Sequence, residues 1–248
     1  IPQILPGSAD EFRLLTDAVG GKGYRQIDIN LGCPFPMIAG KHKGAGMLLY
    51  PAQVAEVLAP IAEYPEIQFS LKMRLGWENA SECMVLVELL NAIRLSRIAL
   101  HARTGKQQYK GHPDLEAFQG FYELCQHPLY YNGGIESLSD IRQILIRFPL
   151  LKGVFIGRGL LSSPLLAKEF KGNETFLPEQ RMSIYFAFHE ELFSAYSQVL
   201  QGETQLLVKM KTLWEYFLPE TDRKLLKRIK KSTRLQQYTE SVKAIFTS

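Results

Sequence analysis

Residues 27–34 read Ile27-Asp28-Ile29-Asn30-Leu31-Gly32-Cys33-Pro34. The alternation of apolar and polar side chains over residues 27–29 predicts a β-strand, and Gly32 with Pro34 ends it. An amide from Asn30 and a thiol from Cys33 therefore follow the strand at its C-terminal end. In a barrel of parallel strands, the chemistry takes place at that end. A thiol there can donate or accept a proton, whereas the alternative for a single cysteine is a buried, inert side chain.

The composition is that of an ordinary globular protein. The chain has 248 residues, of which 46% are apolar and 22% are charged. A chain of this length can form one large domain or a barrel with a small addition. No stretch approaches the roughly 18 consecutive apolar residues of a membrane span, and the first residues lack the pattern of a secretory signal. We therefore expect a cytoplasmic protein that does not enter a membrane.

The three cysteines give no sign of a cross-link or a metal site. Cys33, Cys83 and Cys125 lie far apart, form no Cys-x-x-Cys pair and have no histidine at metal-ligand spacing. We expect reduced thiols, no disulfide framework and no bound metal.

Strand and helix patterns alternate up to about residue 170, which is typical of a parallel α/β fold. The predicted strands cover residues 2–5, 26–30, 68–73, 97–101, 129–132 and 153–156. The predicted helices between them cover residues 9–19, 51–61, 83–93, 115–125 and 138–147. Right-handed crossovers between parallel strands would bring all the strand ends to one face.

Five of these strands end in polar residues or glycines. The endings are Asn30 with Cys33, Lys72 with Arg74, His101 with Arg103, Asn132-Gly133-Gly134, and Gly157-Arg158-Gly159. Because the ends share one face, they can meet around one ligand. For Lys72 the alternative is a structural ion pair, and for His101 it is a satisfied core histidine.

The last two endings predict a phosphate-binding site. Glycines such as Gly133, Gly134 and Gly157 let backbone N–H groups approach a phosphate closely. A helix N-terminus and the Arg158 guanidinium would add positive potential. Asn132 precedes the first of these clusters. One glycine pair alone would indicate only an ordinary turn.

The chain becomes helical and basic after Phe170. Predicted helices cover residues 179–200, 205–217, 222–229 and 232–246, and residues 209–243 include ten basic and four acidic side chains. Several basic residues share a helical face and could neutralise phosphates of a nucleic acid, although a solvated helix is the alternative. They are Arg223, Lys224, Lys227, Arg228 and Lys231. Residues 41–46 are also basic and glycine-rich, which suits a mobile loop in which Lys43 contacts an anionic substrate, or else a solvated loop.

The ordered strand-end motifs resemble those of the tRNA-dihydrouridine synthases. The motifs are residues 30–34, 72–74, 101–104 with 109–111, 132–135 and 156–159. The resemblance covers about residues 1–170 and extends in type to the helical tail. It implies an FMN-dependent TIM barrel, a C-terminal helical domain that binds tRNA, and reduction of particular uridines to 5,6-dihydrouridine.

The resemblance also implies roles for individual residues. Cys33 would protonate uracil C5 while reduced FMN delivers a hydride to C6, and Asn30 would position the uracil. Arg103 would support or contact the substrate, and NADPH would supply the electrons. The FMN contacts implied by the family motifs are Gln3, Lys72, His101, Asn132, Gly133, Gly134, Gly157 and Arg158.

The resemblance suggests an FMN-binding barrel over residues 1–172 and a tRNA-binding helical domain over residues 173–248. Family members have two strands before the first strand found here, and six strands cannot close an eight-stranded barrel. We therefore expect that Ile1 is not the native N-terminus or that a segment has been lost. Two other functions stay open: an FMN-dependent oxidoreductase acting on a small molecule, and a non-catalytic RNA-binding remnant. No obligate protein partner is evident.

Overall fold

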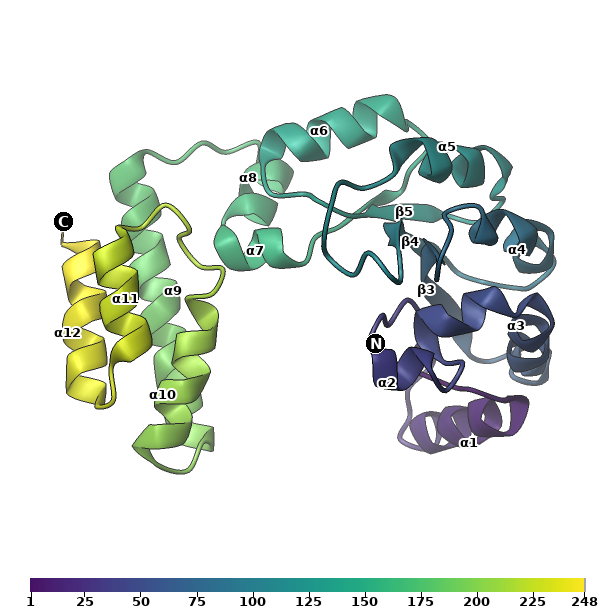
Figure 1. Cartoon of the computed structure of the whole chain (residues 1–248), viewed down its shortest axis with the longest axis horizontal. Coiled ribbons are helices and arrows are strands. Elements are labelled where there is room, and N and C mark those ends of the chain that lie inside the picture. Colours follow the sequence, from purple (N-terminus) through teal and green to yellow (C-terminus); the bar gives the residue numbers. More distant parts are fainter. Residues whose placement is uncertain (248) are drawn as a thin grey trace. The chain divides into compact units, whose positions relative to one another are not determined.

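The computed structural model describes residues 1–247 and contains one parallel sheet of six strands (Figure 1). The strands are β1 (Gln3–Ile4), β2 (Gln26–Leu31), β3 (Gln68–Gly76), β4 (Ile98–Thr104), β5 (Leu129–Asn132) and β6 (Gly153–Phe155). They lie in the sheet in their order along the chain, and every neighbouring pair is parallel. This arrangement confirms the predicted TIM-type α/β fold and all six predicted strands.

A helix follows each of the first five strands, as expected. These helices are α1 (Ala9–Gly20), α3 (Pro51–Leu58), α4 (Glu82–Asn91), α5 (Leu115–Leu124) and α6 (Leu138–Arg147). The 3-10 helix η2 (Ala59–Glu63) continues α3. Side-chain caps define two of the starts: Ser8 accepts a hydrogen bond from the Glu11 N–H at 3.2 Å, and Asp114 accepts one from the Ala117 N–H at 2.9 Å.

Side chains alternate between the two faces of the sheet. In β2, Ile27, Ile29 and Leu31 are fully buried, whereas Asp28 and Asn30 lie on the opposite face and are partly exposed. Directly paired residues of neighbouring strands share a face. The register of the sheet therefore decides which polar side chains of different strands lie together.

The sequence patterns do not predict four short helices of the described residues. They are α2 (Pro36–Ala39), the 3-10 helix η1 (Gly44–Leu49), α7 (Arg158–Ser162) and α8 (Leu166–Gly172). A helix of one or two turns is too short to show an amphipathic period. The expectation of a loop over residues 41–46 is wrong for its second half, because Gly44, Ala45 and Gly46 are buried in η1. A Cβ on Gly46 would lie 2.4 Å from the Ala39 carbonyl oxygen, so this packing requires glycine.

The chain forms two compact units, each with its own core. The first, called the barrel unit, comprises Ile1–Gly134 and Ile141–Phe155. The second, called the helical unit, comprises Ile135–Asp140 and Ile156–Ser248. Aliphatic side chains of the strands and a group of aromatic rings form the core of the barrel unit, with Phe118 and Tyr131 meeting edge to face at 5.0 Å.

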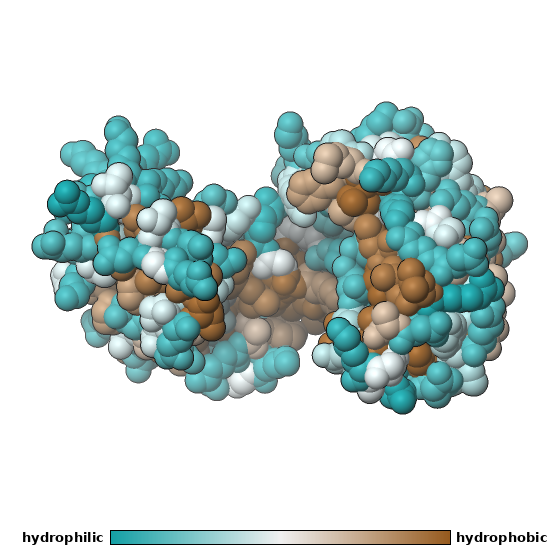
Figure 2. Space-filling view, turned by 90° about the horizontal axis from the view of Figure 1, so that it is seen from below, coloured by the Kyte–Doolittle hydropathy of each residue, from teal (hydrophilic) through white to brown (hydrophobic). Residues whose placement is uncertain are grey.

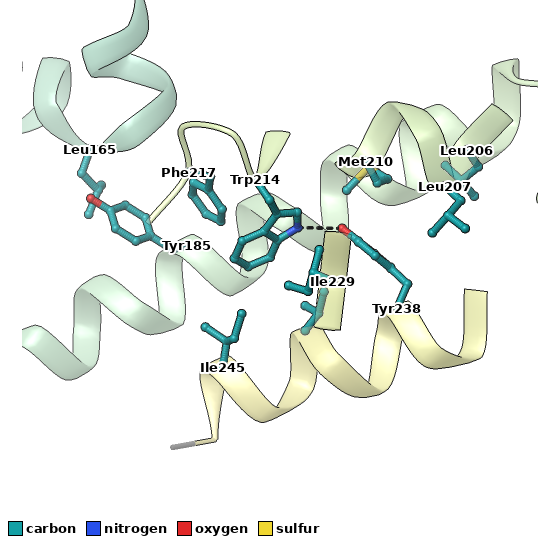
Figure 3. Packing of buried hydrophobic residues seen from close by; sticks show 11 residues of the cluster. Leu165, Tyr185, Leu206, Leu207, Met210, Trp214, Phe217, Ile229, Tyr238 and Ile245 are labelled. Carbon is teal, nitrogen blue, oxygen red and sulfur yellow. Dashed lines mark hydrogen bonds between the residues drawn. The ribbon is translucent and has the colours of Figure 1, made fainter. Parts of the chain in front are cut away.

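Four helices surround the core of the helical unit and confirm the four predicted in the tail. They are α9 (Pro178–Val199), α10 (Gly202–Leu213), α11 (Arg223–Lys231) and α12 (Leu235–Phe246). Large side chains such as Met210, Trp214 and Phe217 are buried between them (Figure 3). Burial of each contributes roughly 1.5–3 kcal/mol to stability.

A chain of hydrogen bonds crosses this core. Trp214 Nε1 donates to Tyr238 Oη at 2.9 Å (Figure 3), and Tyr238 Oη lies 2.6 Å from His189 Nε2. A carboxylate only accepts hydrogen bonds, so His189 Nδ1 donates to Glu190 Oε1 at 3.0 Å. In the neutral imidazole, Nε2 then accepts from the Tyr238 hydroxyl, which itself accepts from the indole N–H. Burial lowers the pKa of His189, and the nearby Glu190 carboxylate opposes this effect.

We predict that acid destabilises this core through His189. Because the pKa of His189 is lowered in the folded state, the unfolded chain binds the proton more readily. The contribution of His189 to stability is complete above its unfolded pKa of about 6.5 and is lost as the pH falls below that value. Urea unfolding at pH 8 and pH 5 should show a smaller loss for His189→Gln than for wild type. Equal losses would contradict the prediction.

Candidate active site

The register of the sheet brings polar residues of five strands together on one face. The directly paired residues are Gln3 with Asp28, Asn30 with Lys72, Arg74 with His101, and His101 with Asn132. Residues two apart in a strand share a face, so these pairs form one continuous set. Five of the predicted site residues therefore belong to it: Gln3, Asn30, Lys72, His101 and Asn132. We call this set the polar face.

Asn30 anchors the segment that carries the cysteine. Its Oδ1 accepts hydrogen bonds from the backbone N–H groups of Gly32 and Cys33, both at 2.9 Å. Its Nδ2 donates to Gln3 Oε1 at 2.7 Å, and Gln3 Nε2 donates to Asp28 Oδ2 at 2.6 Å. The two predicted amides therefore belong to one network that ends at the Cys33 backbone.

Cys33 is a free, partly exposed thiol held from a second side by η1. The Cys33 carbonyl accepts a hydrogen bond from the Ala45 N–H at 3.0 Å. Gly44, with φ +56°, packs so closely that a Cβ on it would lie 2.8 Å from the Cys33 Cβ. Cys83, in contrast, is buried, and burial raises its pKa to about 12, which makes it an inert thiol.

Lys72 is a half-buried cation that lacks a partner in the barrel unit. Among residues 1–247 it forms no hydrogen bond and no ion pair. Burial lowers its pKa, the positive charge of Arg74 lowers it further, and Asp28 acts in the opposite direction. An ammonium group in this position attracts a ligand that has negative charge or hydrogen-bond acceptors.

Arg74 connects two backbone segments beside the polar face. It is 2% exposed, and its guanidinium donates to the carbonyls of Gly32 (3.0 Å), Thr104 (2.8 Å) and Gln108 (2.7 Å). Burial lowers its pKa to about 10. The guanidinium also lies over the Tyr109 ring, 5.6 Å from the centroid. Arg74 therefore links the cysteine segment to the loop that follows β4.

His101 and Arg103 form a buried pair in β4. Arg103 Nη1 lies 3.2 Å from His101 Nε2, and its Nε and Nη2 donate to the Gly111 carbonyl at 3.3 and 2.9 Å. A guanidinium has no acceptor, so His101 Nε2 accepts and the imidazole carries its proton on Nδ1. Arg103 therefore orients the His101 ring through its Nε2 atom. The predicted substrate contact of Arg103 stays a prediction.

Lys43, the other predicted substrate contact, forms an ion pair. Its Nζ lies 2.6 Å from both carboxylate oxygens of Glu11. The hydrogen bond from Lys43 lowers the pKa of Glu11, although burial partly opposes it. The same carboxylate accepts a hydrogen bond from the Gly7 N–H at 2.8 Å. In this structure Lys43 joins η1 to the start of α1.

The predicted phosphate contacts are divided between the two compact units. Asn132, Gly133 and Gly134 end β5 in the barrel unit, and Asn132 Nδ2 donates to the Phe155 carbonyl at 2.8 Å. Gly133 and Gly134 have φ values of +140° and +60°, which favour glycine. Gly157 and Arg158 belong to the helical unit, at the start of α7, and both are exposed.

Helix α11 presents the predicted basic side chains of the helical unit. Ile229 on this helix is buried, whereas the basic residues are exposed and form no ion pair with any residue that the structure describes. The basic residues are Arg223, Lys224, Lys227, Arg228 and Lys231. Four of them line a groove of about 440 Å³ together with polar residues of α12 such as Gln237 and Ser241.

A family model for dihydrouridine synthases (Dus) matches residues 3–247 of this chain. The chain belongs to the dihydrouridine synthase family. This membership confirms the resemblance seen in the strand-end motifs.

Individual relatives are similar over part of that range. A probable tRNA-dihydrouridine synthase of Rhizobium leguminosarum bv. phaseoli is 32% identical over 139 residues, which cover 56% of this chain and 44% of the relative. The tRNA-dihydrouridine synthase B of Vibrio vulnificus (strain CMCP6) is 27% identical over 161 residues, which cover 63% of this chain and 50% of the relative. The chain thus spans about half the length of the curated relatives that it matches.

Solved structures show only a distant similarity. Morphinone reductase in complex with tetrahydroNAD is 14% identical, with a TM-score of 0.48 over 70% of this chain and 51% of the reductase. The old yellow enzyme from Trypanosoma cruzi is 12% identical, with a TM-score of 0.48 over 70% of this chain and 51% of that enzyme. Similarity of this degree carries no functional inference.

Residues 1–247 contain neither a metal-binding cluster nor a membrane span. No group of three or more His, Cys, Asp or Glu side chains there could hold a metal ion. No helix in the same range is long and apolar enough to cross a membrane.

The sequence patterns give no role to two residues of this candidate site. The alternation in β2 places Asp28 on the polar face but does not reveal its partners. The strand ending contains Arg74, but the carbonyls that it binds belong to segments about 30 residues or more away in the chain. No local pattern could have predicted them.

We predict that Lys72→Met stabilises the ligand-free chain by about 0.5–2 kcal/mol, because it removes a half-buried charge without a partner. Since the pKa of Lys72 is lowered, the folded chain loses this proton more readily than the unfolded chain, so the difference should shrink as the pH rises toward about 10.5 and vanish above it. Thermal and urea unfolding measure both effects. Lys106→Met, which removes an exposed ion pair with Glu78, is the control and should stabilise nothing. A destabilised Lys72→Met would contradict the prediction.

Proposed function

We propose that this chain reduces specific uridines in tRNA to 5,6-dihydrouridine with FMN as its cofactor. One observation supports the proposal most: in a member of the dihydrouridine synthase family, Asn30 pairs directly with Lys72 on the polar face and also binds the backbone N–H of Cys33. A proton donor, an amide and an unpartnered cation would then act on one ligand. The two relatives described above carry the corresponding activity in their names.

The chemistry of the polar face suits a flavin. The Lys72 ammonium would stabilise negative charge on the ring, and His101 would donate a hydrogen bond to its carbonyl edge. Gln3 would contact the edge of the ring. Asn132, Gly133 and Gly134 of the barrel unit would contact the phosphate through backbone N–H groups, and the family motif makes Gly157 and Arg158 of the helical unit proposed phosphate contacts as well. FMN, when bound, supplies the hydride for uracil C6, and NADPH is the proposed source of electrons.

Cys33 is the proposed general acid. Its Sγ would give a proton to uracil C5, and its segment is fixed by Asn30 on one side and by Ala45 on the other. Asn30 would also orient the uracil through its remaining N–H. Arg103 would act through His101, and Lys43 would contact RNA only after separating from Glu11.

The helical region is the proposed tRNA-binding domain. A uracil that reacts beside a ring must leave its stack, which costs a few kcal/mol and costs least in a loop. Contacts between the basic face of α11 and RNA phosphates would supply that free energy. We propose a division of labour between residues 1–172, which bind FMN, and residues 173–248, which bind tRNA.

We predict that Cys33→Ala slows dihydrouridine formation by about 10²-fold or more without changing flavin affinity, because only the proton transfer is removed. Single-turnover reduction of tRNA by the flavin-loaded chain measures the rate, and flavin fluorescence measures binding. Cys125→Ala is the matched control and should react as wild type. Full activity of Cys33→Ala would exclude Cys33 as the acid.

The same assays distinguish the two alternative functions. A chain that binds tRNA but no flavin would be an RNA-binding remnant. A chain that reduces a small enone but never tRNA would be a different flavin oxidoreductase.

We predict that tRNA affinity falls steeply with salt and that Lys227→Ala with Lys231→Ala reduces the slope of log Kd against log salt by about 1–2. Each lysine that neutralises a phosphate releases counterions, so its loss flattens the dependence. Filter binding between roughly 50 and 200 mM salt measures the slope. Exposed Lys22 and Lys152 of the barrel unit, both changed to Ala, are the control pair. Equal slopes for wild type and the α11 variant would exclude these lysines as phosphate contacts.

A further inference from the structure

We infer that Asp28 is a positioning residue that fixes the hydrogen-bond direction of Gln3 and Asn30, and through them the backbone at Cys33. The contacts lie entirely within the barrel unit. The catalytic consequence rests on the proposed function. No role for Asp28 follows from the family motifs used above.

The Asp28 carboxylate sets the donor-to-acceptor direction of these hydrogen bonds, because an ionised carboxylate only accepts them. Ser70, which is 3% exposed, donates from Oγ to Asp28 Oδ1 at 2.6 Å. Gln3 donates from Nε2 to Asp28 Oδ2 at 2.6 Å. An amide that turns its nitrogen to Asp28 must turn its oxygen the other way. Asp28 therefore decides which end of the Gln3 amide meets Asn30.

Each remaining hydrogen bond in this chain can then have only one donor and one acceptor. Gln3 Oε1 can only accept, so Asn30 must present Nδ2 to it, at 2.7 Å. Asn30 Oδ1 then points at the backbone N–H groups of Gly32 and Cys33 and accepts both at 2.9 Å. A reversed Asn30 amide would set N–H against N–H at two places and oxygen against oxygen at a third. The carboxylate thus controls backbone order through two intervening side chains.

The same direction decides what the polar face offers to a ligand. A carboxamide nitrogen carries two N–H groups, and Gln3 and Asn30 each use one in the contacts that the structure describes. Each retains an N–H, whereas Gln3 Oε1 already accepts one hydrogen bond and Asn30 Oδ1 accepts two. Gln3 and Asn30 are therefore specific for acceptor atoms, such as the carbonyl oxygens of an imide ring. Without the carboxylate, either amide could present its oxygen and repel such a ring.

The hydrogen-bond chain from Asp28 through Gln3 and Asn30 to the backbone is called the relay. The test measures the end of the relay, the amide hydrogens of Gly32 and Cys33. Hydrogen exchange of the ligand-free full chain is followed by NMR for wild type and Asp28→Asn. We expect about 10-fold faster exchange at these two amides in the variant, because Asn30 is no longer fixed. The matched control is Asp17→Asn, which removes the same charge from an exposed residue that accepts from Tyr64 Oη at 3.0 Å. It should leave both amides unchanged.

A double variant that reverses the hydrogen bond between positions 3 and 28 distinguishes an effect of hydrogen-bond direction from an effect of packing. In the double variant Gln3→Glu with Asp28→Asn, the carboxylate moves to position 3, where it can accept from the new amide at position 28 and from Asn30 together. Exchange at Gly32 and Cys33 should then return to within about 3-fold of wild type. Gln3→Glu alone sets two carboxylates against each other and should be as fast as Asp28→Asn. If Asp28→Asn fails to fold, Gln3→Met breaks the relay at the partly exposed end of a short strand and must give the same acceleration.

Unchanged exchange in Asp28→Asn, or a double variant no slower than the single, overturns the inference. With flavin and tRNA present, Asp28→Asn should lower kcat by about 10-fold and leave the KM for tRNA unchanged, because the α11 contacts are intact. The exchange experiment contains neither flavin nor RNA. A chain that shows the exchange pattern but reduces no uridine would therefore overturn the proposed function and not the relay.

Discussion

Parallel strands held in register place every second side chain on one face, and the candidate site depends on this constraint. Asn30 and Lys72 are far apart in the chain but directly paired, and His101 stands directly opposite Asn132. The covering helices bury the other face, as fully buried Ile27 and Ile29 show. A shift of one residue in any strand would exchange the two faces and remove its polar side chain from the site.

The barrel unit holds two cations on the same strand in different ways. Arg74 is fully buried, and three backbone carbonyls from two segments satisfy it, so it acts as an internal brace. Lys72 is half-buried and without a partner among the described residues, which is unfavourable for a charged group. This contrast is the physical reason to regard Arg74 as structural and to propose Lys72 as a ligand contact.

The barrel unit also presents apolar side chains beside the cysteine segment. Phe35 and Met37 are 67% and 83% exposed, and Figure 2 shows hydrophobic side chains reaching the surface among hydrophilic ones. The helical unit separates its functions more sharply. Its apolar side chains pack around Trp214, while α11 directs its basic side chains outward. An RNA contact made by such exposed cations would leave the packing of that core unchanged.

Local sequence patterns are enough to give the order of the elements, the strand endings and the basic face of α11. Alternation with a period of two and glycine or proline breaks are local properties, so six strands could be read from them. The sequence could not supply the partners of those side chains. The ion pair of Lys43 with Glu11, the carbonyls around Arg74 and the chain from Asp28 to Cys33 join distant segments. Only tertiary structure decided these contacts, because a hydrogen bond depends on distance and direction, and the fold alone fixes both.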